Sequence, residues 1–349
     1  MLNILDPPRA HGSPLARGVL RAEPEDFVVE EELGFAPAGA GQHVLLKVRK
    51  RDANTQWVAR ELARQCRCRS LDVGYAGLKD RRAIAVQWFT VPRTETDWQG
   101  FRGQGFEVME AHPHTRKLPR GALQGNRFTV RVREMPVDDG ALATRLAAIA
   151  ARGVPNYFGP QRFGRDGANL ARVNEDLRAL RNPQERGFVL SAARSLVFNA
   201  VAAERVRDGS WAQLEAGDIA NLDSRGSIFP VSLEQDPTLP ERCSRLEIHP
   251  TGPLWGQGPL SSGGRINALE TEVSARYCQA CTLTEQAGMR QERRALRLAV
   301  RELQWQRDSA GIVISFRLTR GSFATTVLRE IVDSAEPVDE GPNGGPNEG

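Results

Sequence analysis

Two segments with the alternating pattern of a half-buried β-strand lie far apart in the chain, and their separation limits the folds open to it. Residues 125–133 and 311–318 both alternate apolar and polar side chains with a period of two. The residues between them are predicted to be mostly helical. If 311–318 complete a sheet that begins before residue 135, the middle of the chain is an insertion. Such an arrangement would be an α+β fold with a discontinuous sheet domain.

Local patterns predict the elements around this frame. Strands are expected through 27–29, 43–49 and 83–91, and helices over 138–153, 191–208, 267–303 and 325–333. A helix capped by Asn54 or Thr55 would place Val58, Leu62 and Cys66 on one stripe. The predicted domains are 1–153 with 304–335, and the insertion 154–303. The Gly/Pro/Asn/Glu-rich tail, 336–349, is predicted to be disordered.

Charge indicates the kind of partner. The 349 residues carry a net charge of +4, but five acids and no Lys or Arg lie after residue 332. The rest of the chain therefore has a net charge of +9, five more than the whole. A basic body with clustered arginines favours a polyanionic partner, of which nucleic acid is the commonest, although ordinary solubility charge is the alternative.

The same sequence argues against several other classes. No apolar stretch approaches the length of a membrane span, and the start lacks the pattern of a secretion signal, so we expect a cytoplasmic protein without a membrane partner. The five cysteines are an odd count without nearby histidines, and we expect inert thiols and no metal. Phosphate-loop, dinucleotide-binding, zinc-protease and serine-hydrolase motifs are absent.

One carboxylate stands out by its neighbours. Asp80 lies in Tyr75-Ala-Gly-Leu-Lys-Asp80-Arg-Arg, between cations and after a glycine that permits a bend. Nearby cations stabilise an ionised carboxylate, which can act as a nucleophile or a base toward a sugar carbon. A surface turn with Asp at a favoured position explains the same residues. The segment alone favours the turn.

A second signal combines aromatic and basic residues. Between Asn156 and Arg165 three aromatic side chains alternate with Arg162 and Arg165, as in surfaces that stack on bases and bind phosphates. A buried aromatic loop with paired arginines is the alternative. The run Arg116-Lys117-Leu-Pro-Arg120 permits the same two interpretations.

Taken together, these stretches resemble the tRNA pseudouridine synthase D (TruD) family. The similar motifs occur in family order over nearly the whole chain: Pro24-Glu-Asp-Phe27-Val-Val, Tyr75-Ala-Gly-Leu-Lys-Asp80, Lys117-Leu-Pro-Arg-Gly-Ala-Leu-Gln-Gly-Asn126-Arg-Phe128-Thr-Val, Pro155-Asn-Tyr-Phe-Gly-Pro-Gln-Arg-Phe-Gly164, Leu190-Ser-Ala-Ala-Arg-Ser195, Thr251-Gly-Pro-Leu-Trp-Gly256, Arg293-Arg-Ala-Leu296 and Gly321-Ser-Phe-Ala-Thr325. The runs 77–81 and 156–164 are the most specific.

The resemblance implies an isomerase that converts uridine to pseudouridine in tRNA, usually at position 13. It implies a pseudouridine synthase-like catalytic domain with a mixed, mainly antiparallel sheet, and an inserted, mostly helical α/β domain peculiar to the family. It implies tRNA as the partner, no obligatory protein partner, and no cofactor or metal.

Site roles follow from the same resemblance. Asp80 matches the catalytic aspartate, and Arg21 stands where the family commonly has a lysine paired with it. Four residues match positions that contact the uridine: Phe27, Asn126, Phe128 and Phe323. The basic residues expected to contact the rest of the RNA are Lys79, Arg116, Lys117, Arg162 and Arg165.

Two alternatives remain open. One is an RNA-binding module or RNA chaperone that performs no chemistry. The other is an RNA glycosidase in which Glu25 or Asp26 supplies an acid beside Asp80.

Overall fold

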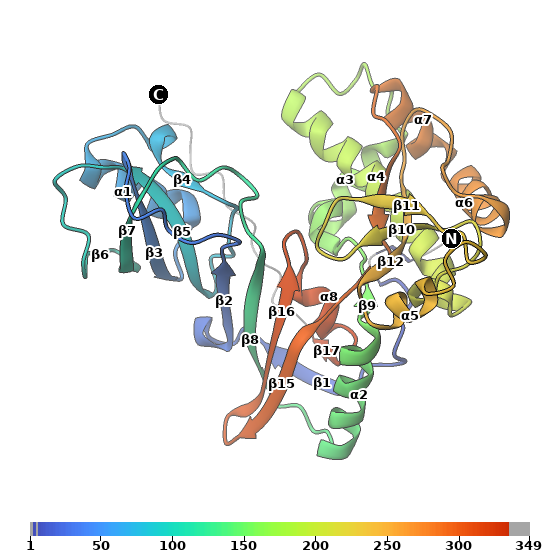
Figure 1. The fold of residues 1–349 in the computed structure, drawn as a ribbon, viewed down its shortest axis with the longest axis horizontal. Coiled ribbons are helices and arrows are strands. Elements are labelled where there is room, and N and C mark those ends of the chain that lie inside the picture. Colours follow the sequence, from blue (N-terminus) through green and yellow to red (C-terminus); the bar gives the residue numbers. More distant parts are fainter. Residues whose placement is uncertain (1–2, 5, 335–349) are drawn as a thin grey trace. The chain divides into compact units, whose positions relative to one another are not determined.

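The computed structural model describes residues 3–4 and 6–334 and divides into two compact units (Figure 1). The sheet unit comprises Leu15–Asp138, Glu302–Gly321 and the last described residues, 332–334. The helical unit comprises the described residues before 15, together with Asp139–Arg301 and Ser322–Ile331. The predicted domains assign the described residues before 15 and the segments 139–153, 302–303 and 322–331 differently, and that division stays a prediction. The tail predicted to be disordered lies outside the described residues.

Eleven strands of the described residues form the sheet of the sheet unit, in the order β15-β16-β8-β2-β5-β3-β7-β6, with β1 beside β8 and β17, and β4 beside β5. The strands are β1 (Ala16–Leu20), β2 (Phe27–Glu32), β3 (His43–Arg51), β4 (Gly74–Tyr75), β5 (Ile84–Pro92), β6 (Arg102–Gly103), β7 (Phe106–His114), β8 (Gly125–Arg133), β15 (Arg301–Asp308), β16 (Gly311–Thr319) and β17 (Val332–Ser334). The pairs β2–β5 and β1–β17 are parallel, whereas β3–β5, β2–β8 and β8–β16 are antiparallel. The predicted α+β class with a mixed sheet is confirmed.

The central strand β8 pairs with one strand from the first part of the chain and one from the last part. β16 pairs with β8 from Ile312 opposite Val132 to Thr319 opposite Gly125, and β2 pairs with the other edge of β8. Figure 1 shows β8 between β2 and β16. The strand after the long middle segment therefore completes the sheet begun before it, the arrangement that the two alternating segments left possible.

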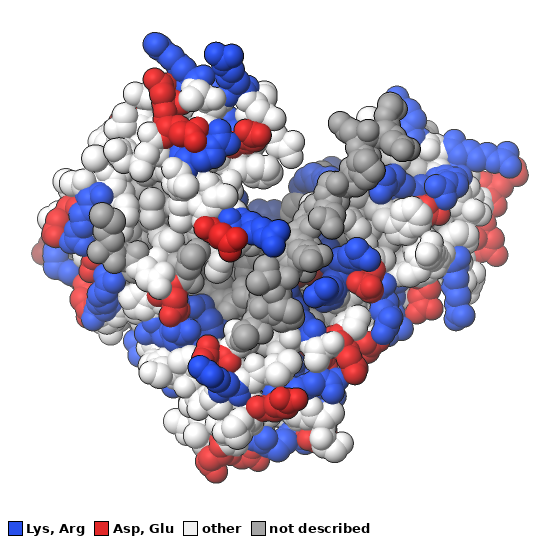
Figure 2. All heavy atoms as spheres, turned by 180° about the vertical axis from the view of Figure 1, so that it is seen from behind, with Lys and Arg blue, Asp and Glu red and all other residues white. Residues whose placement is uncertain are grey.

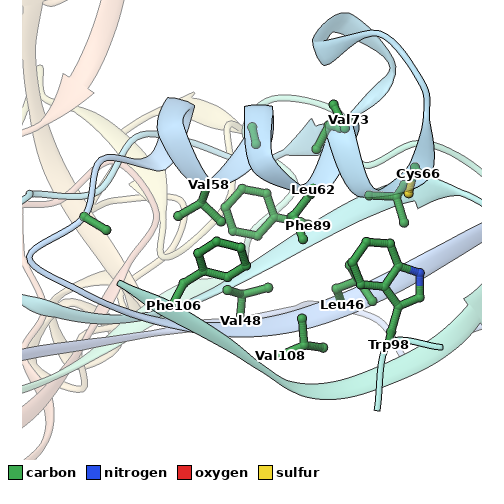
Figure 3. Packing of buried hydrophobic residues seen from close by; sticks show 14 residues of the cluster. Leu46, Val48, Val58, Leu62, Cys66, Val73, Phe89, Trp98, Phe106 and Val108 are labelled. Atoms are coloured by element: carbon green, nitrogen blue, oxygen red, sulfur yellow. The ribbon is translucent and has the colours of Figure 1, made fainter. Parts of the chain in front are cut away.

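Helix α1 (Thr55–Cys66) covers one face of this sheet. The Asn54 side chain caps it by accepting a hydrogen bond from the Gln56 N–H at 2.8 Å. Val58, Leu62 and Cys66 are buried on one stripe, as predicted. Figure 3 shows this stripe above side chains of β3, β5 and β7, among them Leu46, Val48, Phe89, Phe106 and Val108.

The helical unit is built around one long, largely buried helix, α4 (Pro183–Arg207). A four-stranded sheet, β11-β10-β12-β13, and the short pair β14–β9 accompany the helices. Its other elements are α2 (Asp139–Arg152), β9 (Val154–Pro155), α3 (Ala168–Ala171), β10 (Ile219–Leu222), β11 (Ile228–Pro230), α5 (Leu239–Ser244), β12 (Ile248–Leu254), α6 (Gly264–Arg276), α7 (Cys278–Gln286), β13 (Glu292–Ala295), β14 (Arg297–Leu298) and α8 (Ala324–Leu328). None of the helices in the described part of the chain has the length and apolar character needed to cross a membrane.

Two predicted helices are wrong in part. The helix expected over 267–303 ends at Gln286, and three strands occupy 292–308, because β13 pairs with β12, β14 with β9 and β15 with β16. The helix expected over 325–333 ends at Leu328, and Val332 enters β17. In both regions pairing with a distant strand overrides a local helical pattern.

The packing of α1 on the sheet predicts the effect of a cavity. Phe89 is fully buried at the centre of this contact. We expect Phe89→Ala to lower the free energy of unfolding by about 3–5 kcal/mol, because the site cannot collapse around the missing ring. Urea denaturation followed by circular dichroism measures this, with Met109→Ala as control, since Met109 is 51% exposed on β7. Equal stability of the two variants would contradict the packing described.

Candidate active site

The turn that carries Asp80 connects β4 to β5, and buried polar side chains bind its backbone. The Gln87 side-chain amide donates to the Gly77 carbonyl at 2.6 Å. The Thr55 hydroxyl accepts from the Lys79 N–H at 3.0 Å and donates to the Gln87 side-chain oxygen at 3.1 Å. Since Gln87 and Thr55 are buried in β5 and at the start of α1, the turn is fixed by the sheet and the helix together.

Lys50 holds the turn at Asp80 itself. Its side chain is fully buried, and the ammonium group donates to the Asp80 carbonyl at 2.8 Å and to the Ala53 carbonyl at 2.7 Å. Burial lowers the pKa of Lys50 to about 8, against the attraction of the Asp80 charge. A buried ammonium is costly, and its position beneath this turn indicates that the position of Asp80 is tightly set.

The Asp80 carboxylate forms an ion pair with Arg21. Arg21 Nη2 lies 3.0 Å from Asp80 Oδ2, and the two side chains are 13% and 40% exposed. Arg21 follows the last residue of β1 with a φ of 55°, an uncommon conformation for a residue with a side chain. Its guanidinium carbon lies 4.2 Å from the centre of the Phe27 ring. The carboxylate is therefore oriented by a cation that is itself packed in place, while one side stays open to solvent.

Three aromatic rings lie behind this ion pair. Phe27 contacts Phe128 edge to face at 6.0 Å between ring centres, and Phe128 stacks on Phe316 at 5.5 Å. The register places Phe128 opposite Val29 on one side and Phe316 on the other. Phe27 and Phe128 are 3% and 6% exposed, so contact of either ring face with a base requires side-chain rearrangement.

A buried network of charged and amide side chains lies beside the rings. Lys79 Nζ donates to Asn126 Oδ1 at 2.5 Å and lies 3.2 Å from Glu31 Oε1. The register places Asn126 opposite Glu31. Burial raises the pKa of Glu31, and the neighbouring Lys79 opposes this shift. An ammonium group only donates, so the Asn126 carbonyl faces Lys79 and its NH₂ group is left to donate elsewhere.

The structure thus brings together five of the predicted site residues: Arg21, Phe27, Asp80, Asn126 and Phe128. Lys79 belongs to the same site, but its ammonium is engaged by two side chains, and its predicted contact with RNA stays a prediction. Arg116 and Lys117 are exposed in the sheet unit. Phe323, which precedes α8 and is 40% exposed, lies in the helical unit. Arg162 and Arg165 lie there too.

The aromatic run of the helical unit is part of its core. Tyr157, Phe158 and Phe163 are buried in a cluster with residues of α4. The Arg294 guanidinium lies 4.3 Å from the centre of the Phe158 ring, and burial lowers its pKa to about 10. These rings do not present faces for base stacking, so the alternative of a buried aromatic loop is confirmed for them. Arg162 donates to the Ser191 hydroxyl at 2.8 Å.

Surface charge is mixed. On the face displayed in Figure 2, Lys and Arg side chains are interspersed with Asp and Glu. Many arginines of the sheet unit are paired, for example Arg127 with Glu302 and Arg131 with Asp308, both at 2.5 Å. The count of 47 Lys and Arg residues therefore overstates the number of cations available to a polyanion.

Sequence reasoning missed Lys50 and Glu31, although the pattern contained a signal for both. In β3 the inward positions run Leu46, Val48, Lys50, and β2 has Glu31 at the next inward position after Phe27 and Val29. A charged residue on the apolar side of an alternating strand requires a buried partner, and at both positions that partner belongs to the Asp80 turn.

Comparison with known proteins gives a consistent result. The model of the family described as tRNA pseudouridine synthase D (TruD) matches residues 10–177 and 169–331. The tRNA pseudouridine synthase D of Nitrosococcus oceani is 45% identical over 334 residues, which cover 93% of each chain. That of Methylococcus capsulatus is 43% identical over 339 residues, 94% of each chain. A crystal structure from Methanosarcina mazei, provisionally assigned to TruD, has the same fold, with a TM-score of 0.73 over 94% of this chain and 96% of its own at 20% identity.

The buried Lys50 predicts a pH dependence of stability. Its folded-state pKa of about 8 lies below the value of about 10.4 for an unfolded lysine, so between these values the unfolded chain binds more protons. Stability from this group therefore rises with pH from about 8 to 10. We expect the free energy of unfolding of the wild type, relative to that of Lys50→Met, to increase with pH over this range, by up to about 1.4 kcal/mol per pH unit.

Urea denaturation of both proteins at pH 7.5, 8.5 and 9.5 measures this difference. Lys47→Met serves as control, because Lys47 pairs with Glu30 and Glu110 near the surface and its pKa is raised rather than lowered. A constant difference between wild type and Lys50→Met would contradict the assignment.

Proposed function

The chain belongs to the tRNA pseudouridine synthase D family, and from this premise we propose that it isomerises uridine to pseudouridine in tRNA with Asp80 as the catalytic carboxylate. The observation that carries the proposal is the half-exposed Asp80 carboxylate, held 3.0 Å from Arg21 on a turn that three buried side chains fix. An isolated surface turn needs no such support.

The reaction explains what the site must provide. The bond between C1′ and N1 of uridine breaks, the base rotates, and C5 joins C1′. No atom is lost and no electron is transferred, so the balance of the reaction requires no cofactor. A carboxylate can attack C1′ or remove the C2′ proton, and the Arg21 ion pair orients Asp80 for either course.

Asn126 supplies recognition of the base in this proposal. Lys79 occupies its carbonyl oxygen, so the side-chain NH₂ group is the part that can donate to a carbonyl oxygen of uracil. Glu31 in turn forms an ion pair with Lys79. The uridine must first leave its stack, which costs a few kcal/mol, and Phe128 offers a ring beside Asn126 on which the base is received once Arg21 and Phe27 adjust.

The RNA glycosidase alternative requires a second carboxyl group that keeps its proton near neutral pH. Asp26 is fully buried and bound by Arg133 at 2.8–3.0 Å. Glu25 pairs with Arg51 at 2.6 Å, and this hydrogen bond lowers the pKa of Glu25. Neither group suits a general acid, because Arg133 occupies both carboxylate oxygens of Asp26 and the lowered pKa of Glu25 favours loss of its proton.

The finer assignments rest on the family resemblance. We propose uridine 13 as the target, Phe323 as a further contact of the base, and Lys79, Arg116, Lys117, Arg162 and Arg165 as contacts of the RNA. We also propose a cytoplasmic location and action without an obligatory protein partner. Carbodiimide labelling and sequencing of tRNA from a strain that lacks this protein would identify the target position.

The central prediction concerns Asp80. Asp80→Asn keeps the shape of the side chain but removes the charge, so we expect pseudouridine formation to fall by at least about 10³-fold while tRNA binding persists. Release of tritium from C5-labelled uridine in tRNA measures the reaction, and a filter-binding assay measures affinity. Asp52→Asn, at an exposed carboxylate that faces Arg81 at 3.5 Å, is the matched control.

The outcomes of this experiment separate the alternatives. Loss of tritium release in Asp80→Asn alone supports the proposal. Wild-type protein that binds tRNA but releases no tritium would identify a binding module, and free uracil among the products would identify a glycosidase.

Arg21 provides a graded test of the ion pair. Arg21→Met removes the charge beside Asp80, and we expect kcat to fall by about 10²-fold or more, because the carboxylate loses its orienting partner. Arg21→Lys keeps a cation where family members commonly have lysine, and we expect kcat within about tenfold of the wild type. If Arg21→Met were as active as Arg21→Lys, the ion pair would have no role in the reaction.

A further inference from the structure

A basic pocket lies in the sheet unit outside the residues assigned so far to catalysis. It has a volume of about 360 Å³, at the lower end of the range for small-ligand sites. Three parts of the chain form it: the turn that follows β2, the segment 114–124 that leads into β8, and Arg320 directly after β16. Its lining includes three cationic side chains, Arg116, Lys117 and Arg320, and no Asp or Glu among the described residues.

An exposed aromatic ring forms one wall. Phe35 is 41% exposed, and its inner face stacks on His114 at 5.5 Å between ring centres with 21° between the planes. His114 is buried, and its Nδ1 accepts a hydrogen bond from the Ala38 N–H at 3.4 Å. Burial, followed by the nearby charge of Arg116, lowers the pKa of His114. Because Nδ1 accepts the hydrogen bond from Ala38 it carries no proton, and the stacked pair presents the outer face of Phe35 as a flat apolar surface.

Two of the three cations are held in place. The Lys117 ammonium donates to the Leu71 carbonyl, and Arg320 Nη1 donates to the Gly121 carbonyl at 3.0 Å. Arg116 is exposed, and no contact in the described part of the chain binds its guanidinium by a hydrogen bond or ion pair. A flat apolar wall with ordered cations and one uncommitted guanidinium matches a base and its phosphate.

The pocket is connected to the active site through the backbone. The Gly121 N–H donates to the carbonyl of Ala76, the residue before the Asp80 turn, at 2.8 Å. The Gln124 N–H donates to the Glu32 carbonyl at 3.0 Å, one residue beyond Glu31. Gln124 also lines the pocket and lies two residues before Asn126, which corresponds to about 7 Å along a strand.

We propose that this pocket binds one unpaired nucleotide of the substrate RNA close to the target uridine, with its base on Phe35 and its phosphate on Arg116, Lys117 and Arg320. The inference rests on the proposed function, because it takes the target uridine to lie at Asp80. The nucleotide is unpaired, since a base in a duplex does not present a free face to the ring. The pocket would thus help to select an RNA in which the nucleotide beside the target is free.

The test combines protein and RNA changes. Affinity is measured for a tRNA fragment that contains the target uridine and for a series of the same RNA with one abasic site at each neighbouring position. We expect Phe35→Ala to weaken binding of the unmodified RNA by about tenfold. At one abasic position Phe35→Ala should cause no further loss of affinity, because the base that stacks on Phe35 is already missing from that RNA.

Arg116→Ala tests the phosphate contact. We expect weaker binding of every RNA in the series and a slope of affinity against salt that is smaller by about one than in the wild type. Matched controls are Phe188→Ala, at a phenylalanine 53% exposed on α4, and Arg60→Ala, at an exposed arginine of α1. Neither control should change affinity or salt slope.

The outcomes are distinguishable from failure of the proposed function. Wild-type affinity and salt slope in both pocket variants, or additive losses at every abasic position, would overturn the pocket assignment. Tritium release from C5-labelled tRNA is measured in parallel with the wild-type protein, and its absence would overturn the proposed function whatever the binding results.

Discussion

The buried ammonium of Lys50 is the interaction on which the geometry of the site depends. The Asp80 turn belongs to no helix or strand, so two of its carbonyl groups are satisfied by side chains of β3 and β5, and the Lys79 N–H by a side chain of α1. Burying a charge for this purpose costs several kcal/mol, which is offset only when the hydrogen bonds are well formed. The α1–sheet core supplies the rigid surroundings that make those bonds possible.

Strand register determines which side chains accompany the turn. Because β2 and β16 pair with opposite edges of β8, Glu31, Asn126 and Leu318 fall in one row, and Val29, Phe128 and Phe316 fall in the next. A slip of one residue would turn these side chains to the other face of the sheet. The long segment between β8 and β16 therefore has to return its end to β8 in one register for Asn126 and Phe128 to serve the site.

The helical unit shows a different use of the same residue types. Its aromatic run, which in sequence looks like a base-stacking surface, packs against α4 and holds Arg294 between Phe158 and the Asn156 side chain. Arginines are buried in other pairs there as well, including Arg205 with Asp218 and Arg293 with Glu270. Spacing of aromatic and basic residues does not reveal which of them face solvent, because burial depends on the neighbouring elements.

Periodicity is a local property of a chain, and it was enough to predict the main strands and the stripe of α1. The order of motifs was enough to recognise the family, and that resemblance implied a discontinuous sheet domain and singled out Asp80 as the candidate carboxylate. The tertiary structure decided the rest. It showed that Arg21 reaches Asp80, that Lys79 turns inward to Asn126, and that Lys50 lies beneath the turn. It also replaced the predicted end of the helix at 267–303 with strands. These features depend on contacts between residues far apart in the chain, whose energies no local pattern contains.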